Sequence, residues 1–260
     1  MRIALGLSYN GSGYEGWQSQ LSGNTIQDRL EHALGQFTAQ QFRVNCAGRT
    51  DAGVHGLMQV VHFDTALDRD EASWVRGTNA FLPRDIAVQW ARHMPDDFHS
   101  RGSAMARRYA YVVLESPVRP SVEAGRVGWV YRPMDGAAME RAAAHLVGEH
   151  DFSSFRAAQC QAKSPIKTLT RITVSQRGPY WRFEFEANAF LHHMIRNIMG
   201  CLLSVGQGAH SPEWILEVLA ARNRDAAAPT FSPDGLYFMG PVYEERFALP
   251  ASAPAYDWLP

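Results

Sequence analysis

The residues best suited to chemistry lie in one glycine-rich stretch, which reads Cys-Ala-Gly-Arg-Thr-Asp-Ala-Gly-Val-His-Gly from position 46 to 56. It places Asp51 just after Arg49 and shortly before His55. An arginine within about 4–6 Å lowers a carboxylate pKa by roughly 1–3 units. An ionised, oriented aspartate is what covalent attack at a sugar or an electron-poor ring requires. Asp51 is therefore a candidate nucleophile, Arg49 its electrostatic partner, and His55 a residue that either orients the loop or contacts phosphate.

The same stretch also has a purely structural interpretation. Glycine, aspartate and threonine are common turn residues, and an aspartate can cap its own loop. The spacing alone favours this structural role over catalysis, so the choice depends on what the rest of the chain contains.

Arginine dominates the basic residues and is unevenly distributed. Among the 25 basic residues, only Lys163 and Lys167 are lysines. Residues 99–132 carry six arginines against two acids, and residues 152–182 carry four arginines and both lysines without an acid. Because arginine binds phosphate through two donors and stacks on bases, we expect these stretches to face RNA, with 152–167 as an RNA-facing loop. The alternative is a coding bias towards arginine, with charges that only coat the surface.

Composition argues against several classes of protein. No apolar run reaches the roughly 18 residues of a transmembrane helix, and the N-terminus turns polar too soon for a signal peptide, so we expect a cytoplasmic protein without a membrane partner. The cysteines form no C-x-x-C pair, so neither a disulfide framework nor a zinc cage is indicated. His192 and His193 are adjacent, and neighbours on a helix point to different sides, so no metal site is predicted.

The elements that must position these residues follow one order twice. In the first half, apolar periodicity predicts strands at 3–9, 42–46, 58–63 and 85–91, and helices at 25–37 and 69–81, with Asn24 as an N-cap. In the second half it predicts strands at 107–115 and 236–243, a hairpin at 169–177 and 180–187, and helices at 135–147, 190–205 and 212–221, the last capped by Ser211.

Each half is thus β-α-β-β-α-β, the ferredoxin-like pattern. We predict an α+β fold of two such halves, with their sheets side by side and an RNA-binding cleft at the junction. Residues 1–105 would form the half with the Asp51 loop, 106–247 the second half with the basic loop, and 248–260 a peripheral tail.

The run from Gly48 to Gly56 resembles the signature of the tRNA pseudouridine synthase A family. Further blocks resemble that family in the same order, at 14–18, 25–27, 106–109, 150–156, 190–197 and 235–237. The resemblance covers about residues 1 to 245. It implies a continuous central sheet with a pseudo-twofold, in agreement with the repeated element order.

The resemblance also implies roles for individual residues. The family's nucleophile falls on Asp51, its active-site tyrosine on Tyr109, its active-site arginine on Arg196, and an apolar residue that packs the target base on Leu236. A stacked Tyr109 would offset about 1–3 kcal/mol of the cost of base flipping, and its phenol would act as, or relay to, a base. The residues we expect to bind substrate, besides Tyr109 and Leu236, are Arg49, His55, Arg107, Arg108 and Arg156.

The activity implied is conversion of uridine to pseudouridine at positions 38–40 of the anticodon stem-loop of tRNA. The bond from C1′ to N1 is cut, the uracil turns over, and C5 joins C1′. No cofactor or metal is expected, the partner is tRNA, and a homodimer is the family's usual state. Two routes stay open, because Asp51 either adds to C6 of uracil or assists departure of the base at C1′. The general base and the tRNAs modified are not identified.

Other interpretations of these residues also stay open. Tyr109 alternates with Tyr111 and Val113, which alone favours a core position, and Arg196 could pair only with a surface acid. The whole chain could be a non-catalytic RNA-binding protein, although a carboxylate beside the phosphate path would repel RNA. A glycosidase-like hydrolase would need a second carboxylate within about 5–10 Å, and only Glu15 and Asp151 are candidates.

Overall fold

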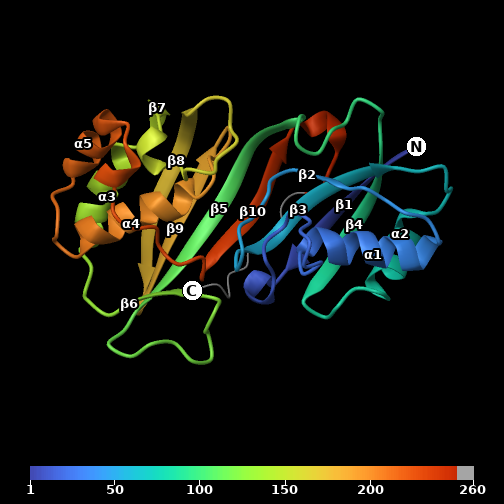
Figure 1. The fold of residues 1–260 in the computed structure, drawn as a ribbon, viewed down its shortest axis with the longest axis horizontal. Coiled ribbons are helices and arrows are strands. Elements are labelled where there is room, and N and C mark those ends of the chain that lie inside the picture. Colours follow the sequence, from blue (N-terminus) through green and yellow to red (C-terminus); the bar gives the residue numbers. More distant parts are fainter. Residues whose placement is uncertain (251–260) are drawn as a thin grey trace. The chain divides into compact units, whose positions relative to one another are not determined.

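The computed structural model describes residues 1–250 and has a mixed α+β fold with a large mixed sheet (Figure 1). The chain divides into two compact units. The first consists of Met1–Arg107 and residues 237–250, and the second of Arg108–Leu236. Of the predicted peripheral tail, residues 251–260 lie outside the described residues.

The first unit has the predicted element order, β-α-β-β-α-β. Its elements are β1 (Arg2–Tyr9), α1 (Ile26–Thr38), β2 (Asn45–Cys46), β3 (His55–Asp64), α2 (Glu71–Asn79) and β4 (Ile86–Met94). Strand β1 lies between β3 and β4 and is antiparallel to both. Strand β3 also pairs with β2, and in parallel with the start of β10 (Leu236–Tyr243).

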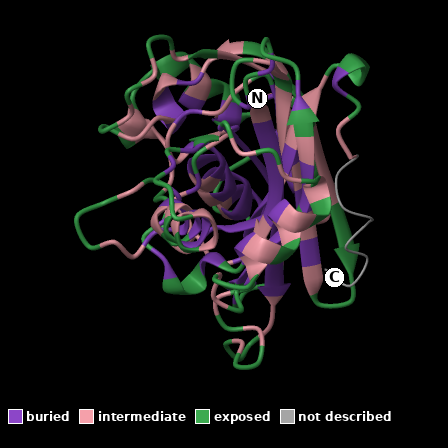
Figure 2. Ribbon diagram, turned by 90° about the vertical axis from the view of Figure 1, so that its right-hand side faces the viewer, coloured by how far each residue is buried: buried purple, intermediate pink, exposed green. Residues whose placement is uncertain are grey.

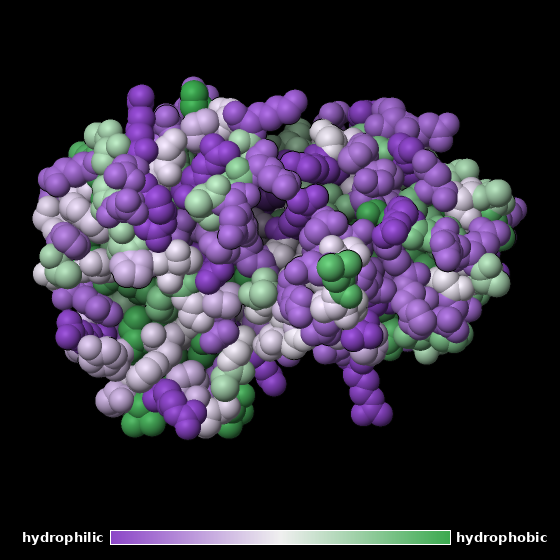
Figure 3. Space-filling view, viewed as in Figure 1, coloured by the Kyte–Doolittle hydropathy of each residue, from purple (hydrophilic) through white to green (hydrophobic). Residues whose placement is uncertain are grey.

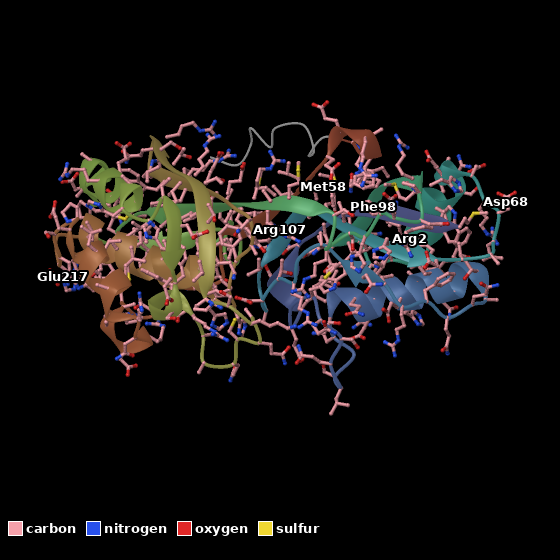
Figure 4. The ribbon with its side chains drawn as sticks, turned by 90° about the horizontal axis from the view of Figure 1, so that it is seen from above. Arg2, Met58, Asp68, Phe98, Arg107 and Glu217 are labelled. Carbon is pink, nitrogen blue, oxygen red and sulfur yellow. The ribbon has the colours of Figure 1, made fainter. Side chains whose placement is uncertain are left out.

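Both faces of this sheet are covered within the unit. The alternation of β1 points Ile3, Leu5 and Leu7 into the core beneath α1 and α2, which lie across one face (Figure 1). On the other face Met58 packs with Phe98, and both are labelled in Figure 4. Period-two alternation explains this division, because neighbouring residues of a strand point to opposite faces. Figure 2 shows the buried residues concentrated on the strands and the inner sides of the helices.

The second unit contains β5 (Ala104–Glu115), which begins in the first unit and continues here. Its other elements are β6 (Gly128–Val130), α3 (Gly136–Ala144), β7 (Gly148–Asp151), β8 (Ile166–Arg177), β9 (Tyr180–Ala187), α4 (Met194–Gly206) and α5 (Trp214–Ala221). The strand order is β5-β9-β8-β7. The predicted hairpin is confirmed, with Arg177 opposite Tyr180 across a turn in which Gly178 has φ +59°. Its inner face buries alternate residues of β9, namely Trp181, Phe183, Phe185 and Ala187.

Several predicted boundaries are wrong. Thr25, not Asn24, caps α1, because its side chain accepts a hydrogen bond from the backbone of Asp28. Helix α4 begins at Met194 rather than at 190, since His193 is left-handed (φ +61°) and cannot continue a helix backwards. Helix α5 has Glu213, not Ser211, at its N-cap.

Three strand predictions also differ from the structure. The expected strand at 42–46 is reduced to Asn45–Cys46, the part that pairs with β3. Strands β6 and β7, with three and four residues, were not predicted. Strand β10, which was expected to close the second half, belongs to the first unit from Tyr237 onward. Its residues Tyr237 and Phe238 pair with His55 and Gly56 of β3.

The surface agrees with the composition. The side drawn in Figure 3 is mostly hydrophilic, with apolar residues in small groups. Within residues 1–250, no helix has the length and apolar character needed to cross a membrane.

Candidate active site

The loop that carries Asp51 is entered through a chain segment bonded to β3. The backbone N–H of Ala47 donates to the carbonyl of Val60 at 2.8 Å. Gln59, which is fully buried, brackets the next residue: its side-chain amide donates to the carbonyl of Gly48 at 2.6 Å, and its amide oxygen accepts from the N–H of Gly48 at 3.4 Å. The peptide before Arg49 is therefore fixed from the side of β3.

Thr50, the neighbour of Asp51, is held at two atoms. Its hydroxyl lies 2.9 Å from the hydroxyl of Tyr9 at the end of β1, and its carbonyl accepts from the N–H of Trp17 at 3.0 Å. Gly16 makes this approach feasible. It has φ +90°, and a Cβ at this position would lie 2.7 Å from the Thr50 carbonyl oxygen. The block at 14–18 thus supports the Asp51 loop directly.

The exit of the loop is anchored by His55. Its side chain is 2% exposed, its Nδ1 accepts from the N–H of Gly11 at 3.1 Å, and its ring stacks on that of Tyr237 with centroids 4.6 Å apart. Because Nδ1 accepts, the neutral ring carries its proton on Nε2. This environment favours orientation of the loop over contact with phosphate, the other role predicted for His55.

Asp51 itself is half-buried and Arg49 is exposed. The carbonyl of Asp51 accepts from the N–H of Val54 at 3.1 Å, which closes a turn. The nearby thiol does not compete as a nucleophile, because burial raises the pKa of Cys46 to about 11 against the opposing charge of Arg49. Asp51 therefore lies on a braced turn with its side chain part-way to solvent.

Arg107, at the start of β5 (Figure 4), binds backbone in the first unit. Its guanidinium donates to the carbonyls of Arg101 at 2.6 Å, Ala104 at 2.9 Å, and Ala47 at 3.3 and 3.4 Å. The phosphate contact predicted for Arg107 has to be weighed against this use of its donors.

In the second unit, Tyr109 lies on β5 and is 8% exposed. Its ring meets that of Phe190 edge-on, with centroids 5.1 Å apart and an interplanar angle of 82°. Next to it, Arg108 has a buried Nε without a hydrogen-bond partner. Since a buried N–H of this kind is costly to leave unpaired, Arg108 is suited to an acceptor supplied by a ligand.

Arg196 lies in the first turn of α4 and is joined to the segment after α5. Its Nε donates to the carbonyl of Phe231 at 2.9 Å, and its own carbonyl accepts from the N–H of Phe231 at 3.1 Å. The same helix begins directly after the left-handed His193. His192 and His193 thus precede the helix, and the helical argument about their directions does not apply.

Leu236 is the first residue of β10 and is 4% exposed. It follows Gly235, which has φ +85° and whose carbonyl accepts from the N–H of Val112 at 2.9 Å. A Cβ on Gly235 would lie 2.2 Å from the carbonyl oxygen of Val112. The glycine therefore brings the start of β10 against β5 within this unit.

The segment at 152–167 differs from the prediction in its aromatic residues. Phe152 and Phe155 are completely buried, so these aromatic rings belong to the core and not to an RNA-facing surface. Arg156 donates to the carbonyls of Cys160 at 2.7 Å and Ala162 at 2.9 Å, and so closes the loop on itself.

Comparison with known proteins decides the family. A family model described as "tRNA pseudouridine synthase" matches residues 7–101 and 142–244. Proteins named "tRNA pseudouridine synthase A" are 78% identical in Polaromonas naphthalenivorans (strain CJ2), 77% in Polaromonas sp. (strain JS666 / ATCC BAA-500) and 64% in Methylibium petroleiphilum (strain ATCC BAA-1232 / LMG 22953 / PM1), each over all of both chains. The chain belongs to the tRNA pseudouridine synthase family. The resemblance seen in the sequence is confirmed.

A solved structure is similar as well. It is the "Crystal Structure of a Cbf5-Nop10-Gar1 Complex", with a TM-score of 0.35 and 12% identity over 86% of this chain and 60% of that chain. A likeness this weak supports no further argument.

Family membership identifies the protein as an isomerase, in which the Asp51 loop is held by the supports described above. The sequence argument did not find Tyr9, Gln59 or Gly16 as such supports. In the sequence, Tyr9 is the last residue of an alternating strand and Gln59 lies inside another strand. Their spacing therefore does not distinguish them from ordinary strand residues. Gly16 lies in the block at 14–18 that resembles the family, and its positive φ explains why a glycine stands at this position.

Asn197 was also missed, although it lies in the block at 190–197. It is completely buried, its amide N–H donates to the carbonyl of Phe155 at 2.8 Å, and its oxygen accepts from Thr230 at 2.7 Å and Arg224 at 3.2 Å. This buried amide, with partners for both its nitrogen and its oxygen, joins three segments of the second unit around α4, which carries Arg196.

Proposed function

We propose that this isomerase converts uridine to pseudouridine in the anticodon stem-loop of tRNA, at positions 38–40, with Asp51 as the nucleophile. The observation that carries the proposal is the braced turn at Asp51. A buried amide and a positive-φ glycine hold the backbone that precedes a half-buried carboxylate, and a tyrosine hydroxyl binds the side chain of the neighbouring Thr50. Such preorganisation is what positions a reacting group at low entropic cost.

The reaction needs no external atom. The bond from C1′ to N1 breaks, the uracil turns, a bond from C5 to C1′ forms, C5 loses a proton and N1 gains one. The product is an isomer, so no oxidant or group donor enters, and we propose no cofactor. Asp51 would act either at C6 of the uracil or at C1′, and both routes use an ionised carboxylate.

The second unit carries the other residues to which the family resemblance gives roles. We assign Tyr109 to stacking on the displaced base and to proton transfer, Leu236 to packing against that base, and Arg196 to the role of the family's active-site arginine. The support is their family position, together with the fixed environment of each: the ring contact of Tyr109, the carbonyl partner of Arg196, and the glycine before Leu236. Arg49 and Arg108 would contact the flipped nucleotide or its phosphate.

The proposal extends to architecture and setting. The element order of the first unit and the strand order β5-β9-β8 of the second support two ferredoxin-like halves. A homodimer that binds tRNA, and a cytoplasmic location, complete the proposal.

The test is pseudouridine mapping on a synthetic anticodon stem-loop containing uridine. The wild-type protein should form pseudouridine, and Asp51→Ala should form none, whereas the matched control Asp68→Asn should equal wild type. Asp68 is exposed and lies far from Arg107, which binds the entry of the Asp51 loop (Figure 4). Alanine is preferred to asparagine at Asp51 because an asparagine can deamidate back to aspartate. Pseudouridine formation by folded Asp51→Ala would exclude the nucleophile assignment, and release of free uracil would indicate a hydrolase.

A further inference from the structure

The guanidinium of Arg107 donates hydrogen bonds to backbone carbonyls of the first unit. It reaches Arg101, Ala104 and Ala47, and the bond to the Arg101 carbonyl is the shortest at 2.6 Å. A guanidinium offers five N–H donors in one rigid plane, which suits it to bridge several carbonyls at once. An ammonium group, a single point charge on a flexible stem, cannot reproduce that geometry.

The carbonyl that matters most belongs to Ala47, which is 1% exposed and directly precedes the Gly-Arg-Thr-Asp run. Gln59 holds the following residue, Gly48, from β3. Arg107 and Gln59 therefore bind two successive residues at the entry of the loop. A shift of either residue passes along a short stretch of backbone to Asp51.

The other two carbonyls bound by Arg107 lie in a segment that is itself fixed to the strands. Within it, Ser100 is completely buried, and its hydroxyl donates to the carbonyl of Asn45 at 2.7 Å. Its backbone N–H donates to Nδ1 of His62 at 3.2 Å, and its carbonyl accepts from the hydroxyl of Tyr243 at 2.6 Å. Arg107 thus ties Ala47 to a rigid support.

We propose that Arg107 is a positioning residue for Asp51 and not a ligand of RNA phosphate. The inference rests on the proposed function, in which Asp51 reacts with the uridine. It revises the expectation that Arg107 and Arg108 both bind phosphate. Of the two, Arg108 has the buried Nε without a partner, whereas Arg107 binds three carbonyls.

The test compares Arg107→Lys with Arg107→Gln. The first keeps the positive charge and loses the planar fork, and the second loses both. Single-turnover rate constants are measured at saturating anticodon stem-loop RNA, and Kd is measured over a range of salt concentrations. Arg76→Gln is the matched control, since Arg76 is exposed on α2 and outside the site.

We expect both variants to lower the single-turnover rate constant by about 100-fold, the loss associated with a misplacement of about 1 Å. We expect Kd to stay within about twofold, and the slope of log Kd against log salt to stay unchanged. A phosphate ligand behaves differently, because its loss weakens binding and reduces the salt slope by about one. The control should match wild type in all three measurements.

Two outcomes overturn the inference. One is a rate constant near wild type for Arg107→Lys but not for Arg107→Gln, since charge alone would then suffice. The other is a weaker Kd with a reduced salt slope and an unchanged rate constant. A lower thermal midpoint alone would change the active fraction and not the rate constant, which separates positioning from a merely structural role.

Ser100→Ala keeps the inference testable where Arg107→Gln does not fold. It removes one hydroxyl from the same support, and its rate constant should fall without a change in Kd. An unchanged rate constant in folded Ser100→Ala would then count against the inference. Failure of the proposed function would show differently, as inactive wild-type protein or active Asp51→Ala.

Discussion

Two loops of this chain each place an arginine among aromatic neighbours, a combination that suits nucleic acid, and the structure uses them differently. In the loop at 47–56, buried side chains from neighbouring strands bind the backbone of Gly48 and the hydroxyl of Thr50, and Asp51 is left half-buried. In the segment at 152–167, the loop's own Arg156 binds the backbone, and Phe152 and Phe155 fill the core. The first loop is held by residues outside it and leaves the side chain of Asp51 accessible, whereas the second loop is held by its own Arg156.

The difference shows how residue type can mislead. A cluster of basic and aromatic residues without acids predicts an RNA-facing surface, yet rings are expensive to leave in water and guanidinium groups bind carbonyls readily. In the second loop Arg156 and the two rings are used for folding. Where other residues do the bracing, as at Asp51, a functional group can remain available for chemistry.

The largest effect on this comparison should come from Gly16→Ala. The change forces a side chain into φ +90° and places Cβ 2.7 Å from the carbonyl oxygen of Thr50. Backbone strain of this kind costs about 1–3 kcal/mol, and the collision should displace the neighbour of Asp51. We expect the single-turnover rate to fall about 100-fold.

The matched control for Gly16→Ala is Gly23→Ala. Gly23 also has positive φ (+67°), but a Cβ there meets nothing within 4 Å. It should lose stability, as judged by urea unfolding, and keep its rate. Equal rates for the two variants would show that the brace at Thr50 does not position Asp51.

Much of the fold could be predicted because period-two and helical patterns report burial directly. The alternation in β9 and the turn at Gly178 located the hairpin, and the apolar face of 25–37 located α1. The errors arise where tertiary contacts decide. Helix α4 starts at Met194 because His193 adopts φ +61°, and β10 pairs with β3 through Tyr237. No local sequence pattern indicates either feature.

The site could be predicted in part, for a related physical reason. Asp51 is marked by its glycine-rich loop, and the family blocks supply Tyr109 and Arg196. The bracing residues carry no such mark, because a buried Gln59 or Tyr9 looks like any residue of an alternating strand. Only the three-dimensional pairing of β1 and β3 with the loop reveals them.

A second prediction concerns pH and the support of the first loop. Burial, with a smaller effect of His99, lowers the pKa of His62 from 6.5 to about 4. The folded state therefore binds a proton less readily than the unfolded state, so stability is lost as the pH falls from 6.5 towards 4. At about 1.4 kcal/mol per pKa unit, roughly 2 kcal/mol should be lost between pH 7 and pH 5.

The contacts of His62 give the structural reason. Its Nδ1 accepts from the N–H of Ser100 at 3.2 Å, and a protonated ring has no acceptor. Urea unfolding at pH 7 and pH 5 measures the effect, which His62→Gln should abolish. His150→Gln, at a half-buried histidine beside the second loop, should leave it in place. A pH dependence shared by wild type and His62→Gln would place its origin elsewhere.

The smallest effect should come from Tyr9→Phe, which removes one hydroxyl from the brace. Burial raises the pKa of the Tyr9 phenol well above its usual value, so the group is a neutral hydrogen-bonding partner of Thr50 at 2.9 Å. Its loss leaves a buried hydroxyl of Thr50 without this bond, at a cost of about 1–2 kcal/mol. We expect the single-turnover rate to fall about tenfold, the equivalent of about 1.4 kcal/mol.

The control for Tyr9→Phe is Tyr180→Phe, which removes the hydroxyl that binds Glu123 at 2.8 Å in the second unit. This variant should keep its rate at saturating RNA. If Tyr9→Phe loses stability but keeps its rate, the hydroxyl holds the fold together without holding Asp51, and the external brace reduces to Gly16, Gln59 and Arg107. If its rate falls as expected, a single hydrogen bond from outside the first loop, between Tyr9 and Thr50, contributes to the position of Asp51.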